Sequence, residues 1–350
     1  MAFKLDNLRS DALSRFDTVI DVRSPAEFAE DHVPGAINLP VMSNEERATI
    51  GTIYVQESAF RARKLGAAIV ARNAADHIET HLSGKDGAWQ PLVYCWRGGQ
   101  RSGSFASFLS QIGWRTEVLE GGYRSYRTQV VRMLYEDALP HSFVLLDGNT
   151  GSGKTAILHA LKAQGAQMLD LEGLANHRGS LLGAMHDEQP SQKMFESRLA
   201  QALMRLDPSR PIVAEAESSK IGERLIPASV WKTMRAAPRI DIAASLEARA
   251  KFLTRDYADV LEDPSRMAER LDKLRALCSH QRVEQWLEFL RQGKHEQLAA
   301  DLMQHHYDRG YERSRAGREN TVLATLQTEG LEPSDIAQLA TRVKALLDQV

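Results

Sequence analysis

An eight-residue phosphate-loop motif constrains this chain more than any other feature. It fits the pattern G-x-x-x-x-G-K-[ST] in full, follows an apolar run at Phe143–Leu146, and precedes a helix-compatible segment at Ala156–Ala163. In this strand–loop–helix context the backbone N–H groups of the loop wrap around a phosphate chain. We therefore expect an α/β domain that binds a diphosphate, which Lys154 neutralises while Thr155 can hold a magnesium ion. The motif residues are Gly148, Asn149, Thr150, Gly151, Ser152, Gly153, Lys154 and Thr155.

Further apolar runs in the same half of the chain predict more strands of one sheet. They lie at Ala166–Leu171, Pro211–Ser218 and Arg239–Ser245, with helix-like segments between them. Strands that alternate with helices favour a parallel sheet, and ligands bind at the carboxyl ends of such strands. Candidate magnesium contacts near those ends are Asp170 and Glu172, or Glu215 and Glu217, and Arg178 is a candidate second anion contact. A solvated strand end is the alternative for each acid.

A cysteine loop is the second chemical feature. Cys95 ends the apolar run Pro91–Cys95, and we expect a tight loop from Cys95 to Arg101 before the next helix. Loop amides and a helix start make an anion site, and nearby positive charge lowers a thiol pKa and favours the nucleophilic thiolate. We predict that Cys95 is catalytic; the alternative is a buried cysteine before a surface turn. The loop residues around it are Arg97, Gly98, Gly99 and Arg101.

Three regions are expected along the chain. Residues 1–140 form an α/β domain with strands at Thr18–Val22 and Pro91–Cys95 and a helix over Ser58–His81. Residues 141–245 form the phosphate-loop core, and residues 246–350 form a helical region, because apolar side chains recur there at spacings of three and four. Pro333 marks the start of the last helix. We expect the helical region to pack on the phosphate-loop core.

Aromatic and basic side chains alternate within the helical region. Arginine pairs with phosphate and stacks on bases, and tyrosine stacks too. Because the formal net charge is -2, nucleic-acid contacts require such a local patch. We predict RNA contacts here, with an amphipathic surface turn balanced by Asp308 and Glu312 as the alternative. The predicted RNA-contacting residues are Tyr307, Arg309, Tyr311, Arg313 and Arg315.

Cysteine usage and hydropathy indicate the compartment. Two cysteines are too few for a disulfide framework or a four-cysteine zinc site, and the pair His305-His306 has no evident third metal ligand. The sequence shows no secretory signal and no apolar run near the roughly 20 residues that span a bilayer. We expect a cytoplasmic protein with no bound metal and no membrane partner.

Three segments resemble the rhodanese family, in the family's order. They are Asp21–Phe28, His32–Asn38 and Leu119–Tyr123, the last after the cysteine loop. The resemblance covers about the first 135 residues and implies that the loop cysteine handles sulfur or selenium. The loop is one residue longer than in the usual sulfurtransferase, a length similar to that of the cysteine phosphatases of the same fold. We therefore expect a pocket for a larger oxyanion, such as a phosphate-bearing chalcogen donor.

The fusion of a rhodanese-like domain to a phosphate-loop domain resembles the tRNA 2-selenouridine synthase family over nearly the whole chain. The matching segments are Tyr94–Gly99, Gly148–Thr155, His177–Ser180, Glu215–Ser218 with Ile221-Gly222, and His306–Asp308. The resemblance implies a transferase that acts on tRNA bearing wobble 2-thiouridine, with selenophosphate and geranyl diphosphate as co-substrates and an S-geranyl intermediate. It implies no tightly bound cofactor, with Mg²⁺ as a candidate, and a selenophosphate-producing enzyme as a candidate partner.

Two other functions remain open at this point. One is an ATP-dependent tRNA sulfurtransferase or kinase with a fused rhodanese domain, because the phosphate-loop motif does not identify its ligand. The other is a non-catalytic RNA-binding scaffold, which the two intact chemical motifs disfavour.

Overall fold

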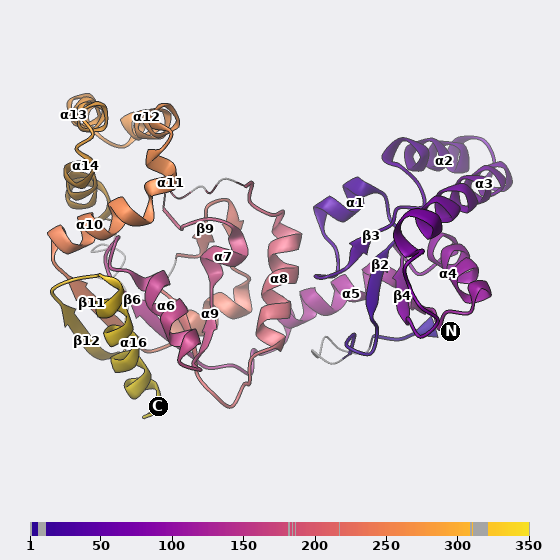
Figure 1. Cartoon of the computed structure of the whole chain (residues 1–350), viewed down its shortest axis with the longest axis horizontal. Coiled ribbons are helices and arrows are strands. Elements are labelled where there is room, and N and C mark those ends of the chain that lie inside the picture. The colour runs from indigo at the N-terminus through magenta and orange to yellow at the C-terminus, as the bar shows by residue number, and fades with distance from the viewer. Residues whose placement is uncertain are drawn as a thin grey trace. The chain divides into compact units, whose positions relative to one another are not determined.

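A computed structural model of the chain describes residues 2–5, 12–180, 183, 185, 187–216, 218–308, 310 and 321–349 (Figure 1). The chain divides into two compact units. The first consists of Met1–Ala138 and Pro190–Arg205, and the second of Leu139–Gln189 and Leu206–Val350. Each unit has a five-stranded parallel sheet, so the predicted α/β class is confirmed. None of the described helices is both long and apolar enough to span a bilayer.

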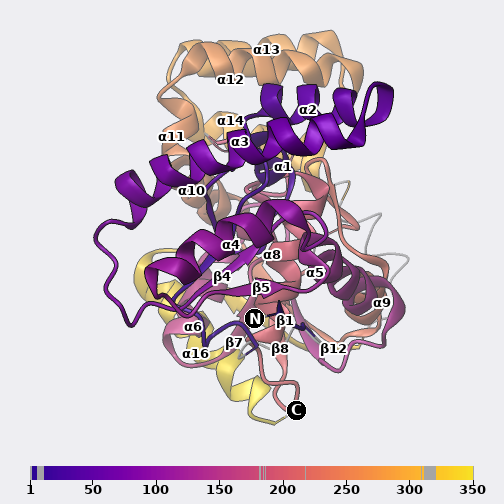
Figure 2. The same cartoon turned by 90° about the vertical axis from the view of Figure 1, so that its right-hand side faces the viewer.

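The sheet of the first unit has the strand order β1-β5-β4-β2-β3, and all its pairs are parallel. The predicted strands at Thr18–Val22 and Pro91–Cys95 are present as β2 and β4. The helices α2 and α3 lie side by side as a hairpin (Figure 2). The strands are β1 (Ala2–Phe3), β2 (Thr18–Asp21), β3 (Ile37–Asn38), β4 (Pro91–Tyr94) and β5 (Glu117–Leu119). The helices are α1 (Pro25–Glu30), α2 (Asn44–Gln56), α3 (Ala59–His77), α4 (Gln100–Ile112) and α5 (Gly122–Val131), with π-helical turns η1 (Ile78–Leu82) and η2 (Arg132–Glu136).

The helix α8 (Gln192–Met204) belongs to the first unit, although its flanking chain belongs to the second. The carboxylate of Glu196 on α8 is 3% exposed and accepts hydrogen bonds from Arg127 and, at 2.7 Å, from Tyr135. The hydroxyls of Ser197 and of Tyr123 both donate to the buried carboxylate of Asp31, at 3.1 Å and 2.6 Å. Buried polar groups with several mutual partners fix one packing arrangement, so α8 is anchored to the rhodanese-like unit.

The sheet of the second unit has the order β12-β11-β6-β8-β7, again with parallel pairs only. Side chains of β6, α6 and α16 form its main core. The helices α11 to α14 form a layer apart from the sheet, beyond α10 (Figure 1). The strands are β6 (Phe143–Asp147), β7 (Gln167–Leu169), β8 (Ile212–Glu215), β11 (Arg239–Ala244) and β12 (Val322–Thr328), with a small pair β9 (Lys220–Ile221) and β10 (Arg224–Leu225).

The helices that support this sheet and the helical layer run through the rest of the second unit. Those near the sheet are α6 (Lys154–Ala163), α7 (Leu171–Ala175), α9 (Ala228–Ala236) and α16 (Pro333–Leu347). The others are α10 (Leu246–Asp256), α11 (Ala258–Leu261), α12 (Pro264–Asp272), η3 (Lys273–Ala276), α13 (His280–Arg291), α14 (His295–Leu302) and the π-helical turn η4 (Met303–Tyr307). Trp286 is fully buried in the core of the helical layer and donates to Asp301 at 2.7 Å.

A strand interrupts the region that we expected to be helical. The segment Val322–Thr328 forms β12 and pairs in parallel with β11 along its length. Valine and threonine favour strands because their branched side chains fit a pleated surface. The prediction of a helical region over 246–350 was therefore wrong for this segment, which completes the sheet of the phosphate-loop unit.

Replacing Arg127 with alanine should loosen α8. The change leaves the buried carboxylate of Glu196 without its guanidinium partner, and breaking a buried ion pair in this way costs about 3–5 kcal/mol. We expect amide hydrogen exchange within α8 to become about a hundredfold faster, measured by mass spectrometry. Arg132→Ala is the control, because its pair with Asp137 is exposed and such pairs contribute less than about 1 kcal/mol. Equal exchange in the two variants would contradict this anchoring.

Candidate active site

The cysteine loop begins where β4 ends. Cys95 follows Tyr94 directly and is 4% exposed, and α4 begins at Gln100 with Gly99 as its N-cap. The loop is therefore shorter than the predicted Cys95–Arg101 segment, because Arg101 already lies in the first turn of α4. The thiol sits at the N-terminus of this helix, where the free amides and the helix dipole favour negative charge.

Two hydrogen bonds point at the sulfur of Cys95. The backbone N–H of Gly99 donates to Sγ at 3.3 Å, and the buried hydroxyl of Ser102 donates at 3.1 Å. Burial raises the pKa of the Cys95 thiol, but the hydrogen bonds from Ser102 and the charge of Arg101 outweigh it, so the pKa is lowered overall. The site thus stabilises a buried thiolate, the nucleophilic form of cysteine.

Two glycines allow a second turn to pack against the cysteine loop. Gly98 has φ +64°, and a Cβ there would lie 2.6 Å from the carbonyl oxygen of Leu119. Gly122 has φ +58°, and a Cβ there would lie 2.2 Å from the carbonyl oxygen of Cys95. In addition, the N–H of Tyr123 donates to that same Cys95 oxygen at 2.8 Å. The resemblance segment Leu119–Tyr123 therefore supports the backbone of the cysteine loop at Cys95.

The two arginines of the predicted oxyanion loop have different surroundings. Arg97 is exposed on the loop. Arg101 donates to Glu27 at 3.0 Å, and Arg47 contacts the same carboxylate at 2.8 Å. Burial raises the pKa of Glu27, but these two guanidinium groups lower it overall, so the carboxylate stays charged. Glu27 therefore orients Arg101 beside the thiol, and sequence reasoning did not assign it this role.

The phosphate loop joins β6 to α6, as the motif predicts. The helix begins at Lys154, so the first helical turn includes the last two motif residues. Gly151 and Gly153 adopt φ +79° and φ +74°, a backbone region that side-chain-bearing residues rarely adopt. The ammonium of Lys154 donates to the carbonyl of Gly148 at 3.1 Å and so lies across the loop. This arrangement gathers amide donors and one cation around a single space.

The acidic candidates separate into two groups. The hydroxyl of Thr155 donates to Glu215 and, at 3.2 Å, to Glu172, and Glu215 is 1% exposed at the end of β8. Asp170 instead caps α7 by accepting from the N–H of Gly173 at 2.7 Å. The structure therefore brings two of the candidate carboxylates to the hydroxyl of Thr155, whereas Asp170 stabilises a helix start. Glu217 lies outside the described residues.

A tyrosine and two arginines border the phosphate loop. Arg178 lies over the ring of Tyr257, 4.7 Å from its centre, and both side chains line the space in front of the loop. Arg249 is 6% exposed and donates to the carbonyl of Thr150 at 3.1 Å and to both carboxylate oxygens of Asp308. Sequence reasoning found Arg178 and missed Arg249, which resembles any other arginine of an amphipathic helix.

The predicted RNA-contacting stretch falls mainly outside the structural description. Arg309, Tyr311, Arg313 and Arg315 are not among the described residues. Tyr307 is described, and it is half-buried at the end of η4, next to Asp308. Its side chain lines a cavity together with Thr150 of the phosphate loop. RNA contact by this stretch stays a prediction.

Comparison with known proteins links both halves of the chain to one family. A model described as the tRNA 2-selenouridine synthase AAA domain matches residues 141–282, and a rhodanese-like domain model matches residues 4–129. A tRNA 2-selenouridine synthase of Bdellovibrio bacteriovorus is 34% identical over 295 residues, which cover 78% of this chain and 75% of that relative. A tRNA 2-selenouridine synthase of Nitrosomonas europaea is also 34% identical, over a match that covers 72% of this chain and 66% of that relative. A solved rhodanese-related protein of Thermoplasma volcanium covers 35% of this chain and 91% of its own, at 20% identity and a TM-score of 0.22.

Replacing Ser102 with alanine should make Cys95 less reactive near neutral pH. The variant loses a donor to the thiolate, and hydrogen bonds to charged groups contribute about 1.5–3 kcal/mol, so the thiol pKa should rise. We expect alkylation by iodoacetamide to slow about tenfold at pH 7 and to approach the wild-type rate at high pH, where both thiols are ionised. Ser110→Ala, exposed on the same helix, is the control. An unchanged pH profile would show that Ser102 does not stabilise the thiolate.

Proposed function

Because this chain belongs to the tRNA 2-selenouridine synthase family, we propose that it replaces the sulfur of wobble 2-thiouridine in tRNA with selenium. The donors in this proposal are geranyl diphosphate and selenophosphate. One observation carries it: a phosphate loop with two carboxylates at Thr155 occurs in the same chain as a buried cysteine of lowered pKa. Each site suits one of the two donors, and both donors are anionic.

The phosphate loop serves the alkylation step in this proposal. The thiocarbonyl sulfur bonds to C1 of the geranyl group while the C1–O bond breaks, inorganic diphosphate leaves, and the N3 proton of the base is released to solvent. Negative charge grows on the leaving oxygen, so donors already aimed at the diphosphate stabilise the transition state more than the ground state. Such donors are the ammonium of Lys154 and the loop amides other than those of Gly148 and Ser152, which bond to Asp147 and Asn149. Arg178 borders the same space and adds a second positive charge.

The cysteine loop serves the selenium step. Alkylation turns a poorly leaving thiocarbonyl sulfur into a thiol-type leaving group. The selenium of selenophosphate attacks the ring carbon, geranyl thiol departs with one proton, and water cleaves the P–Se bond to release phosphate. The positive potential around Cys95, from the start of α4 and from Arg101, favours binding of the anionic selenium donor.

Magnesium fits the donor set at the phosphate loop. The available groups are the hydroxyl of Thr155 and the carboxylates of Glu172 and Glu215, all oxygen donors. Magnesium prefers oxygen ligands and is commonly held by one or two carboxylates together with substrate phosphates. When bound, it would neutralise charge on the departing diphosphate. Glu215 is the better placed of the two acids, because the buried end of β8 fixes its position.

The proposed partners follow from the same chemistry. The tRNA would contact the arginine- and tyrosine-rich stretch that contains Arg309, Arg313 and Arg315, through phosphate pairing and base stacking. Selenophosphate is supplied by an enzyme that phosphorylates reduced selenium. An ATP-dependent sulfurtransferase or kinase is the competing activity, and nucleotide turnover distinguishes it from the proposed one.

Replacing Cys95 with serine should separate the two steps. Alkylation by a diphosphate needs no protein thiol, so we expect geranylation of 2-thiouridine tRNA to remain within about threefold of wild type. Handling of the selenium donor, in contrast, needs the Cys95 thiolate in this proposal, so selenium incorporation should fall at least about a hundredfold, as measured by mass spectrometry of the nucleosides. Cys278→Ser is the matched control and should leave both steps intact. Equal loss of both products in a folded Cys95→Ser variant would overturn this division of labour.

Replacing Lys154 with alanine should stop the first step and, through it, the second. The lost cation contacts charge that develops on the diphosphate, and such contacts are worth about 10²–10³ in rate. Selenation of 2-thiouridine tRNA should fail in Lys154→Ala, whereas selenation of tRNA supplied already geranylated should proceed. Lys162→Ala, exposed on the same helix, is the control. Turnover that consumes ATP in step with product would instead support the sulfurtransferase or kinase.

A further inference from the structure

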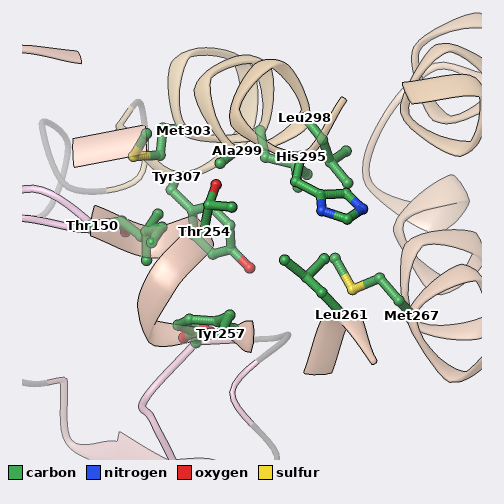
Figure 3. A pocket seen from close by; sticks show the side chains of 13 residues that line it. Thr150, Thr254, Tyr257, Leu261, Met267, His295, Leu298, Ala299, Met303 and Tyr307 are labelled. Atoms are coloured by element: carbon green, nitrogen blue, oxygen red, sulfur yellow. The ribbon is translucent and has the colours of Figure 1, made fainter. Parts of the chain in front are cut away.

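An apolar cavity lies next to the phosphate loop in the second unit (Figure 3). Its volume is about 500 Å³, including the space that opens to solvent. The walls come from α10, α11, α12, α14 and η4, and they consist mainly of aliphatic and thioether groups. The side chains that define it include Leu253, Leu261, Met267, Leu298, Leu302 and Met303.

The cavity adjoins the phosphate-binding space. Four residues line both: Thr150, Ser180, Leu253 and Tyr257. Thr150 lies on one side of the cavity, and Met267 and His295 lie on the opposite side (Figure 3). A molecule with its phosphate group at the loop would therefore have apolar walls next to it, beyond Thr150 and toward Met267.

The boundary between the two spaces is held in place by polar contacts. Arg249 joins the carbonyl of Thr150 to the carboxylate of Asp308, which follows the cavity wall at η4. The hydroxyl of Ser180 lies 3.3 Å from that of Tyr257, and Arg178 covers the Tyr257 ring. These contacts fix polar groups where the two spaces adjoin, and the cavity walls beyond them are mainly hydrophobic.

We propose that this cavity binds the hydrocarbon chain of the prenyl diphosphate while the phosphate loop binds its diphosphate. That the hydrocarbon chain is a geranyl group rests on the proposed function. An amphiphile with one charged end needs an anion site joined to an apolar site, and this is the juxtaposition that the structure contains. Each methylene that leaves water for such a site favours binding by about fourfold. A nucleoside fits less well, because its ribose hydroxyls would lose hydrogen bonds to water against aliphatic walls.

The size of the cavity predicts selectivity for chain length. Ala299 is the smallest side chain that α14 contributes to the wall, so a larger residue there fills space that the hydrocarbon chain would occupy (Figure 3). Met267 lies at the end of the cavity opposite Thr150, so a smaller residue at position 267 lengthens the cavity. Ala299→Leu should shorten the acceptable chain, and Met267→Ala should lengthen it.

Calorimetric binding to the full-length protein tests the cavity directly. We expect wild type to bind geranyl diphosphate at least about a hundredfold more tightly than inorganic diphosphate. Ala299→Leu should reduce that ratio below about tenfold while inorganic diphosphate binds as before, which also shows that the loop is folded. Gln297→Leu adds the same side chain on the exposed face of α14 and should leave the ratio unchanged. Met267→Ala should raise the affinity for farnesyl diphosphate relative to geranyl diphosphate.

The outcomes separate the cavity from the proposed activity. Equal wild-type affinities for geranyl and inorganic diphosphate would overturn the cavity assignment, as would an unchanged ratio in Ala299→Leu. Transfer of the geranyl group to 2-thiouridine tRNA is measured separately, by mass spectrometry. Preferential binding of geranyl diphosphate without transfer would support the cavity and contradict the proposed reaction. Transfer that is indifferent to both cavity variants would support the reaction and reject the cavity.

Discussion

The buried guanidinium of Arg249 connects the two chemical environments of the phosphate-loop unit. It fixes the carbonyl of Thr150 in the loop and, through both its terminal nitrogens, the carboxylate of Asp308 after η4. A buried charge requires such partners, and removing one of them is strongly destabilising. The helical layer is therefore tied to the loop at the point where the polar phosphate space meets the apolar cavity. Loop geometry and cavity shape depend on the same side chain.

The two candidate sites stabilise negative charge by related means in separate units. At Cys95 the donors are the amide of Gly99 and the hydroxyl of Ser102, and they act on a charge that belongs to the protein. At the phosphate loop, the amides and Lys154 would act, in the proposed reaction, on a charge that arrives with the diphosphate donor. In both sites the hydrogen-bond donors are positioned before the charge appears, so little reorganisation is needed.

The chain passes between the two units three times, because α8 belongs to the first unit while the segments before and after it belong to the second.

Sequence reasoning succeeded where a motif dictates local geometry. The glycine-rich loop before Lys154 and the strand before Cys95 require particular backbone conformations, and both elements are present as predicted. It failed where tertiary contacts decide. Nothing in the residue spacing of α8 indicates that Glu196 pairs with Arg127, which lies 69 residues earlier in the chain. Arg249 likewise looks like a surface arginine in the sequence, because only the folded chain brings Asp308 to it. The apolar cavity is likewise invisible in sequence, since its walls come from several helices.

The requirement for a prenyl donor in selenation tests the central claim most directly. Purified protein, 2-thiouridine tRNA and selenophosphate would be incubated with and without geranyl diphosphate, and the nucleosides followed in time by mass spectrometry. The account predicts that S-geranyl-2-thiouridine rises and then decays as 2-selenouridine appears, and that neither product forms without the prenyl donor. Formation of 2-selenouridine at the same rate in the absence of geranyl diphosphate would contradict it.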